Sequence, residues 1–279
     1  GHSSRSREMI THLIKRGHTV KVASYDRGYK NLKDDFDVLE IEGFSIVSED
    51  NKVSISKTFT QNFNTILDRF EASNTLKQKY FKEFQPDCVI TDFEPMAAYL
   101  ANELDVPLIT IDNQHRMRYM EFPCPFEWKA EALFIENLIR VMIPRPCVSL
   151  VTTFYFGEKK NERTFTFPPI LRQSVINAKP SIGDYILVYA TQEYDSLIEN
   201  IQNYKREKFI IYGFNEDKVE ENLTYKTFSR EGFLQDLAGS KAVIATAGFT
   251  LMTESFYLGK PYLALPMKGQ FEQVLNGLM

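Results

Sequence analysis

Short apolar runs alternate along the chain with segments whose apolar side chains recur at helical spacing. Met9, Ile10, Leu13 and Ile14 fall on one face of a helix, whereas PDCVITD has the continuous apolar character of a buried strand. In the first half, this pattern predicts strands at 18–24, 37–41, 86–92, 106–112 and 147–153, and helices at 3–16, 56–84, 94–104 and 130–142. Because buried strands that alternate with helices form parallel sheets, we predict a doubly wound α/β fold.

A second alternation of strands and helices begins after a stretch in which apolar residues show no clear periodicity. Residues 154–184 contain two adjacent prolines and mixed charge, which is typical of a crossing between domains. Beyond it we predict strands at 185–191, 208–214, 223–228, 242–246 and 261–266, and helices at 193–204, 230–237 and 250–258. We therefore expect two Rossmann-like domains, 1–153 and 185–279, joined by a linker at 154–184 and facing across a ligand cleft.

Both ends of the sequence fall inside predicted α/β units. The chain opens on Gly1 and His2 and runs directly into a helix, and it stops at Met279 within a helical pattern. We expect the first strand of the first domain and the last helices of the second domain to lie outside this sequence.

Composition limits the kinds of partner that the protein can bind and the cellular compartment in which we expect it. Lys and Arg number 33 against 37 Asp and Glu, so the net charge of −4 provides no basic field for nucleic acid. The three cysteines form no CxxC pair, which argues against a disulfide framework or a zinc site and favours a reducing cytoplasm. No apolar run approaches the ~18 residues that a membrane span needs. We expect a cytoplasmic protein without a metal site.

The stretch 241–276 carries the densest candidate chemistry. Its strand leads into the turn Thr246-Ala247-Gly248-Phe249 at the start of a helix, beyond the carboxyl end of the strand, where ligands bind in such sheets. Free N–H groups and the positive end of the helix dipole suit a diphosphate there without a metal. Glu254, further into the helix, either bonds vicinal hydroxyls such as those of ribose or simply favours the helix dipole.

Amide and acidic side chains follow in the next loop and helix. Gln270, Glu272, Gln273 and Asn276 lie within KGQFEQVLN, and the last two amides share a helix face because they are three residues apart. Amides recognise neutral polyols because each supplies donors and an acceptor. A solvated helix face is the commoner use of such residues.

His2 is the candidate general base at the other end of the chain. It precedes a helix at the carboxyl edge of the first sheet. The pKa of a histidine side chain ordinarily lies near neutrality, which suits removal of a proton from an alcohol. Asp92, at the end of its own strand, is the first candidate to orient the imidazole, and Glu94 is the second. The competing interpretations are a surface histidine and acids that cap a helix.

A polar cluster, Asp112 to Arg116, follows the strand 106–112. Asn113, His115 and Arg116 are candidates to line an acceptor pocket at this edge of the sheet. Ordinary loop chemistry explains the cluster equally well.

Together these stretches resemble a known family. TAGFTLMTESFYLGKPYLALPMKGQFEQVLN is similar to the donor-sugar signature of GT-B glycosyltransferases of the UDP-glucuronosyltransferase and peptidoglycan N-acetylglucosaminyltransferase types. GHSSRS resembles the end of a Gly-x-Gly-His-x-x-Arg loop, and ITDFEPMAAYLANELDVPLITIDNQH resembles the acceptor-domain strand and helix. The resemblance covers nearly the whole chain, is strongest after Phe228, and points to a poorly characterised bacterial and archaeal branch.

The resemblance implies a role for each candidate residue. His2 matches the general base and Asp92 its supporting acid. The donor-side matches are the diphosphate turn (Thr246, Ala247, Gly248, Phe249), the ribose acid (Glu254), the sugar-reading residues (Gln270, Glu272, Gln273), the nucleotide-side amide (Asn276) and the backbone at 228–230, which faces the base. The turn lacks the histidine of some relatives, and Glu272-Gln273 replaces the commoner Asp-Gln, which leaves the sugar open.

The expected activity is an inverting, metal-independent transfer of a sugar from a UDP-sugar to a hydroxyl acceptor, with no cofactor besides the donor. A role in cell-envelope glycan or glycolipid synthesis would fit it. A UDP-sugar 2-epimerase, which would need several carboxylates around the sugar ring, and a non-catalytic nucleotide-sugar binder are the alternatives. The apolar helix with flanking arginines within 130–145 either touches the inner face of the membrane and a lipid-linked acceptor or packs on the sheet, as such helices more often do.

Overall fold

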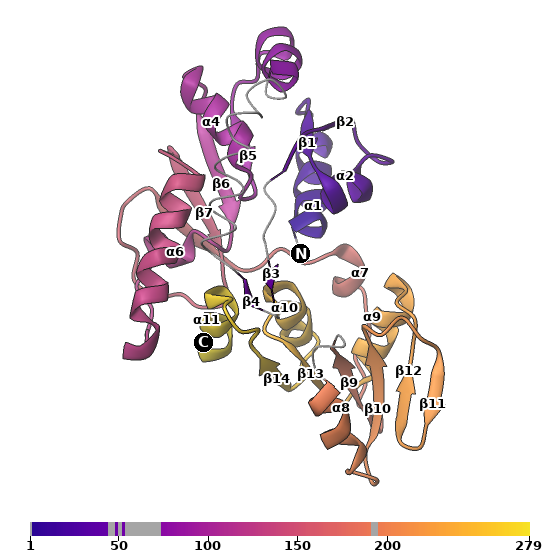
Figure 1. The fold of residues 1–279 in the computed structure, drawn as a ribbon. Helices are drawn as coiled ribbons and strands as arrows, with labels where there is room; N and C mark the ends of the chain where they lie inside the picture. Colours follow the sequence, from indigo (N-terminus) through magenta and orange to yellow (C-terminus); the bar gives the residue numbers. More distant parts are fainter. Residues whose placement is uncertain (1, 44–47, 50–51, 54–73, 191–194) are drawn as a thin grey trace. The chain divides into compact units, whose positions relative to one another are not determined.

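The computed structural model describes residues 2–43, 48–49, 52–53, 74–190 and 195–279 (Figure 1). These residues form two compact units, Gly1–Ile170 and Leu171–Met279. The boundary between the units falls inside the predicted linker 154–184. Both units are built on parallel sheets flanked by helices, so the predicted α/β fold class is confirmed.

The first unit contains three separate sheets among its described residues. Strands β1 and β2 form a parallel pair, β3 and β4 an antiparallel pair, and β5-β6-β7-β8 a fully parallel sheet in sequential order. The elements are α1 (His2–Lys15), β1 (Val22–Ser24), α2 (Asp26–Leu32), β2 (Val38–Glu40), β3 (Ser48–Glu49), β4 (Lys52–Val53), the π-helix η1 (Lys77–Phe84), β5 (Val89–Thr91), α4 (Pro95–Glu103), β6 (Leu108–Asp112), α5 (Arg116–Tyr119), the 3-10 helix η2 (Phe126–Trp128), α6 (Lys129–Met142), β7 (Val148–Thr152) and β8 (Thr164–Phe167).

Helix α4 shows how the sequence sets the start and the buried face of an element. Glu94 is the N-cap, and Pro95 occupies the first helical position, where its missing N–H costs nothing. Ala98 and Ala101 are completely buried and pack with Leu108 of β6. Their small side chains let the helix approach the sheet closely, which places the carboxyl ends of β5 and β6 next to the start of α4.

The second unit is a six-stranded sheet of order β11-β12-β10-β9-β13-β14. All neighbours are parallel except the edge pair β11–β12. The chain order reverses between β9 and β13, which makes this pair the topological switch point. The elements are α7 (Gln173–Ile176), β9 (Tyr185–Tyr189), α8 (Asp195–Gln202), β10 (Lys208–Tyr212), β11 (Lys218–Glu220), β12 (Leu223–Tyr225), α9 (Arg230–Gly239), β13 (Ala242–Thr246), α10 (Phe249–Tyr257), β14 (Tyr262–Leu265) and α11 (Phe271–Leu278).

The central strands of this sheet are buried on both faces. Leu187 of β9 packs with Val175 and Leu237, whereas its neighbour Val188 packs with Ile201 on the opposite face. Successive side chains of a strand point to opposite faces, so the apolar run at 185–190 reads as continuous. That continuity is why the sequence predicted this strand and its parallel partners.

Several elements differ from the sequence prediction. The segment 154–184, predicted to be an irregular linker, contains β8, which pairs with β7, and α7, which packs in the core of the second unit. Short elements without strong periodicity were missed: α2, α5, η2, β3, β4 and β11. The predicted helix 56–84 lies outside the described residues up to residue 73, and its last eight residues form a π-helix.

No helix in the described parts of the chain combines the length and apolar character that crossing a bilayer requires.

Candidate functional site

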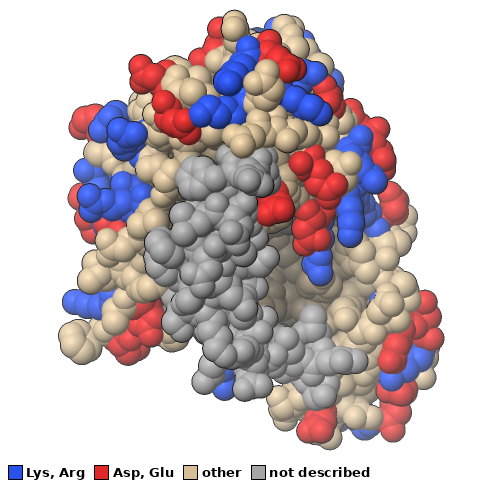
Figure 2. Space-filling view, turned by 45° about the horizontal axis from the view of Figure 1, so that its top comes forward, with Lys and Arg blue, Asp and Glu red and all other residues tan. Residues whose placement is uncertain are grey.

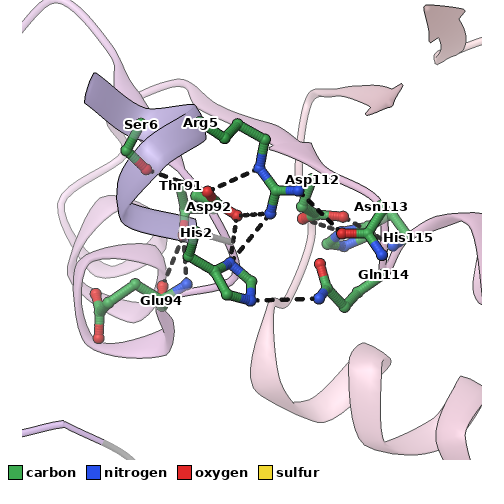
Figure 3. A network of polar contacts seen from close by, with 10 residues as sticks. All are labelled: His2, Arg5, Ser6, Thr91, Asp92, Glu94, Asp112, Asn113, Gln114 and His115. Carbon is green, nitrogen blue, oxygen red and sulfur yellow. Dashed lines mark hydrogen bonds and ion pairs between the residues drawn. The ribbon is translucent and has the colours of Figure 1, made fainter. Parts of the chain in front are cut away.

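His2 and Asp92 meet at the carboxyl edge of the first unit's sheet (Figure 3). His2 is the first residue of α1, and Asp92 directly follows β5. The imidazole Nδ1 lies 2.8 Å from Asp92 Oδ1. The His2 side chain is 54% exposed and that of Asp92 is 17% exposed, so the imidazole faces solvent while its carboxylate partner lies beneath it.

Arg5 binds the same carboxylate from the next turn of α1. Its Nε donates to Asp92 Oδ2 at 2.9 Å, and its Nη2 donates to Oδ1. Ser6 Oγ donates to Oδ2 at 3.1 Å, and Arg5 Nη1 reaches Asn113 Oδ1 at 3.0 Å. Arg5 was given no role in the sequence analysis. Its position three residues after His2 on a helix was the available signal.

These contacts determine the charge of Asp92 and surround both ring nitrogens of His2. Burial alone would raise the pKa of Asp92, but the charges of His2 and Arg5 and the hydrogen bonds from both side chains hold it well below its usual range. An ionised Asp92 favours a proton on Nδ1 of the neutral imidazole, whereas Arg5 Nη2, itself a donor, lies 3.1 Å from the same nitrogen. Gln114 Nε2 lies 3.5 Å from His2 Nε2, consistent with Nε2 as the acceptor nitrogen. The half-exposed imidazole is therefore contacted at Nδ1 by Asp92 and at Nε2 by Gln114.

Glu94 does not contact His2. Its carboxylate accepts the N–H groups of Met96 and Ala97, both at 2.8 Å, and so caps α4. Figure 3 shows this side chain pointing away from the imidazole. Burial raises the pKa of Glu94, opposed by these two hydrogen bonds. The helix-cap interpretation applies to Glu94, and Asp92 is the carboxylate that orients His2.

The polar cluster that follows β6 is buried. Asp112, His115 and Arg116 are all 0% exposed. Asp112 accepts the backbone N–H of His115 at 2.8 Å and faces its Nδ1 at 2.7 Å. His115 and Arg116 are thus fully buried here, and the assignment of both to an acceptor pocket stays a prediction. Asn113, 2% exposed, supports Arg5.

The turn after β13 lies at the topological switch point of the second sheet. Gly248 is the N-cap of α10, and no side chain caps this helix end. The φ of Gly248 is −72°, and an added Cβ would meet only Thr246 Oγ1, at 3.9 Å. Neither backbone conformation nor packing requires glycine here. The absent side chain leaves room for a ligand to approach the backbone at the positive end of the helix.

Three hydrogen bonds hold this turn in shape. Asn276 Nδ2 donates to the Ala247 carbonyl at 2.8 Å, the Tyr262 hydroxyl donates to the Thr246 carbonyl at 2.6 Å, and the Gly248 N–H donates to the Thr246 carbonyl at 2.7 Å. Asn276 is 1% exposed, so it braces the turn from within and offers little surface to a nucleotide. Because the Gly248 N–H is used inside the turn, the N–H groups offered to a ligand belong to the first turn of α10.

Glu254 lies in the second turn of α10, beyond the reach of a first-turn dipole effect. It is 4% exposed and accepts two hydrogen bonds from Arg172, from Nε at 2.8 Å and from Nη2 at 2.7 Å. Glu254 shares a helix face with Thr250 and Leu251, which lie four and three residues before it. Arg172 lies in the predicted linker, and the sequence analysis gave it no role.

The remaining donor-side candidates lie at the start of α11. Gln273 Nε2 donates to Gln270 Oε1 at 2.6 Å, and Gln273 Oε1 accepts the Met267 N–H at 3.2 Å. Gln270, Glu272 and Gln273 are all half-buried. Phe228, predicted to mark the segment that faces the base, is 53% exposed, and Ser229 caps α9.

Charges of both signs are interspersed on the face drawn in Figure 2. That pattern agrees with the small net charge of −4 and contains no single-sign field on this face. Among the residues that the structure describes, no group of three or more His, Cys, Asp or Glu side chains is arranged to hold a metal ion.

Comparison with known proteins agrees on one class. The profile of the family described as "Glycosyl transferase family 1" matches residues 1–279. An "Uncharacterized glycosyltransferase" of Methanosarcina acetivorans is 23% identical over 312 residues, covering 99% of this chain and 79% of that protein.

Two solved structures share the fold. The glycotransferase of kitacinnamycin superposes with a TM-score of 0.66 at 14% identity, covering 98% of this chain and 80% of that one. UGT89C1 of Arabidopsis thaliana complexed with UDP gives a TM-score of 0.64 at 14% identity, covering 98% of this chain and 79% of that one. Both are similar to this chain in fold.

Proposed function

Because the chain belongs to glycosyl transferase family 1 and is a glycosyltransferase, we propose that it transfers a sugar from a UDP-sugar to an acceptor hydroxyl with inversion. The observation that carries the proposal is the exposed His2, oriented by the Asp92 carboxylate, in the first unit; the second unit separately provides an uncapped helix start at the switch point of its own sheet. The first is suited to removing a proton, and the second to binding a diphosphate.

The donor half of the site is proposed to lie along α10. The first-turn N–H groups bind the diphosphate, without need of a metal, and Glu254 accepts hydrogen bonds from the ribose hydroxyls. Thr250 and Glu254 lie four residues apart on one face, or about 6 Å along the helix axis. Gln270, Glu272 and Gln273 are proposed to contact the sugar. A relative of this fold was solved in complex with UDP, which supports the choice of nucleotide.

His2 is proposed as the general base. Its Nε2 takes the proton of the acceptor hydroxyl while that oxygen attacks the anomeric carbon, and the bond to the diphosphate oxygen breaks with its electron pair. Asp92 holds the imidazole in the Nδ1-protonated tautomer and stabilises the imidazolium that forms. A positioned base typically contributes about 10²–10⁴-fold to the rate, and donors aimed at developing charge contribute several kcal/mol more, on the order of 3.

Variants of His2 test this assignment. In His2→Gln we expect kcat to fall by about 10²–10⁴-fold, while UDP binding, measured by calorimetry, stays within about twofold because the donor half is unchanged. The assay follows release of UDP from a panel of UDP-sugars with alcohol acceptors, and it also follows ring epimerisation. Unchanged turnover in His2→Gln would show that His2 is not the general base. Detection of an epimerised sugar in the donor would contradict the transferase mechanism and support the epimerase mechanism.

A contact of α6 with a lipid-linked acceptor at the membrane surface, in cell-envelope glycan or glycolipid synthesis, belongs to the same proposal. Leu133 is 63% exposed and Val141 is 50% exposed on this helix, and Phe126 just before it is 84% exposed. Exposed apolar side chains beside Lys129 and Arg140 suit an anionic interface. Binding to vesicles that contain anionic lipid, compared between the natural protein and Leu133→Glu, checks this contact.

A further inference from the structure

The ion pair between Arg172 and Glu254 is nearly buried and engages both carboxylate oxygens. Nε donates to Oε1 at 2.8 Å and Nη2 to Oε2 at 2.7 Å. The Glu254 side chain is 5% exposed and the Arg172 side chain is 24% exposed. Each oxygen therefore receives one hydrogen bond from the guanidinium. Such a bidentate pair fixes the plane of the carboxylate as well as its charge.

The pair leaves acceptor capacity on both oxygens. An ionised carboxylate has about four lone-pair sites, of which Arg172 occupies two. One site remains on each oxygen, and a vicinal diol needs two neighbouring acceptors. By this count of acceptor sites, Glu254 can hold Arg172 and the hydroxyls of a ribose at the same time.

The backbone of Arg172 is anchored within the second unit. Arg172 is the N-cap of α7, and its carbonyl accepts the N–H groups of Val175 at 3.0 Å and Ile176 at 3.1 Å. Val175 is completely buried in the core that contains Leu187 and Leu237. Arg172 therefore reaches Glu254 from a rigid support, although the two residues are 82 positions apart in the chain.

A purely structural role accounts poorly for this pair. Desolvating both charges is costly, and well-packed apolar side chains of similar volume usually stabilise a fold as well or better. An ion pair on the face of α10 that begins at the uncapped turn is explained if the carboxylate must be held in one orientation to accept further hydrogen bonds.

We propose that Arg172 is the positioning residue of the nucleotide-ribose subsite, holding the Glu254 carboxylate oriented so that it accepts both vicinal hydroxyls of a nucleoside diphosphate. This inference rests on the proposed function, which assigns the ribose to Glu254. Arg172 acts through Glu254, so removing it affects a ligand that has the hydroxyls and spares a ligand that lacks them.

The test compares UDP with 2′,3′-dideoxy-UDP by calorimetry on the purified protein and its variants. For Arg172→Met we expect UDP affinity to fall about tenfold, since a charge-assisted network is lost, while the affinity for dideoxy-UDP stays unchanged. Glu254→Gln is expected to show the same loss of discrimination. Arg172→Lys keeps the charge but not the two-point geometry, so it recovers part of the discrimination. It also serves as the second variant if Arg172→Met does not fold.

Lys208→Met is the matched control. It removes an ion pair with Asp184 in the same unit, where both side chains are solvent-exposed, and we expect both affinities to stay as in the natural protein. Thermal unfolding of every variant verifies that the fold is intact.

Three results would overturn the inference. One is Arg172→Met binding UDP with unchanged discrimination. Another is an equal loss for both nucleotides, which would mean that Arg172 acts on the phosphates or on the fold. Tighter UDP binding would mean that Arg172 competes with the ribose. Failure of the natural protein to bind UDP at all would instead remove the proposed function itself, so the two failures are distinguishable.

Discussion

At the scale of single residues, chemistry depends on which of two similar groups the backbone turns toward a partner. Asp92 and Glu94 are two positions apart after the same strand. Asp92 faces His2 and Arg5, whereas Glu94 accepts two N–H groups of α4. The sequence predicted both as candidates for one role. Only the direction of each side chain separated the acid that contacts His2 from the acid that caps the helix.

Gly248→Ala tests the interpretation of the donor turn. The backbone angles there suit alanine and the site has room, so we expect the free energy of unfolding to change by less than about 1 kcal/mol. UDP affinity is expected to fall about tenfold, because a methyl group then stands where the phosphate approaches. Urea unfolding and calorimetry measure the two quantities. Full UDP affinity in Gly248→Ala would show that no ligand approaches this backbone.

Asp92 makes the stability of the first unit depend on acid pH. Its pKa in the folded protein is lowered below the unfolded value of about 3.9, so its contribution is present above that pH and is lost as the pH falls through the folded value. We expect Asp92→Asn to be less stable than the natural protein at neutral pH, since Arg5 then loses its charge partner, and the difference to narrow as the solution is acidified. Urea unfolding of both proteins across the acid range measures this. A difference that is independent of pH would contradict it.

At the scale of elements, the periodicity of the chain predicted the central strands and their helices, and the turn that joins β13 to α10 shows what periodicity omits. Strand β13 was predicted at its observed bounds because its apolar run is continuous. The brace that shapes the following turn comes from α11 and β14, through Asn276 and Tyr262. Asn276 was predicted as a nucleotide contact, since its type and spacing in the sequence do not reveal that its amide is turned inward.

Asn276→Ala tests the brace between elements. Losing the amide leaves the Ala247 carbonyl without this buried donor, so we expect about 1–3 kcal/mol of destabilisation. UDP affinity should fall as well, because the turn loses one of the hydrogen bonds that shape it. Asn200→Ala, on the exposed surface of α8, is the control and should change neither quantity appreciably. Denaturant unfolding and calorimetry report both effects. Equal stability of the two variants would mean that the turn does not need α11.

At the scale of the whole molecule, the chain divides into two units at the boundary between their hydrophobic cores, and not at residue 185, where the alternation of strands and helices resumes. The sequence predicted the second domain from residue 185, yet the second unit begins at Leu171 because Val175 packs with the core of its sheet. Strand β8, also inside the predicted linker, pairs with β7 of the first unit. A single edge strand and a four-residue helix carry too little periodicity to be recognised without their partners.

Fragments with the two alternative boundaries test this division. Residues 171–279 retain α7 and Arg172, so we expect this fragment to fold and to bind UDP without catalysing transfer, since His2 is absent. Residues 185–279 expose the apolar surface that Val175 covers and leave Glu254 without Arg172. We expect that fragment to be less stable and to bind UDP more weakly. Circular dichroism and calorimetry make the comparison, and equal behaviour of the two fragments would place the boundary at residue 185.

The sequence by itself determined the alternation of strands and helices and the glycine turn between β13 and α10, and it singled out a histidine and an acid as candidates for base catalysis, because local spacing and residue type suffice for each. Only the tertiary structure decided which acid meets His2, that the residues from Asp112 to Arg116 are buried, and that Arg172 meets Glu254. These outcomes depend on contacts between segments far apart in the chain, and such contacts are set by how strands pair and helices pack, which no local pattern records.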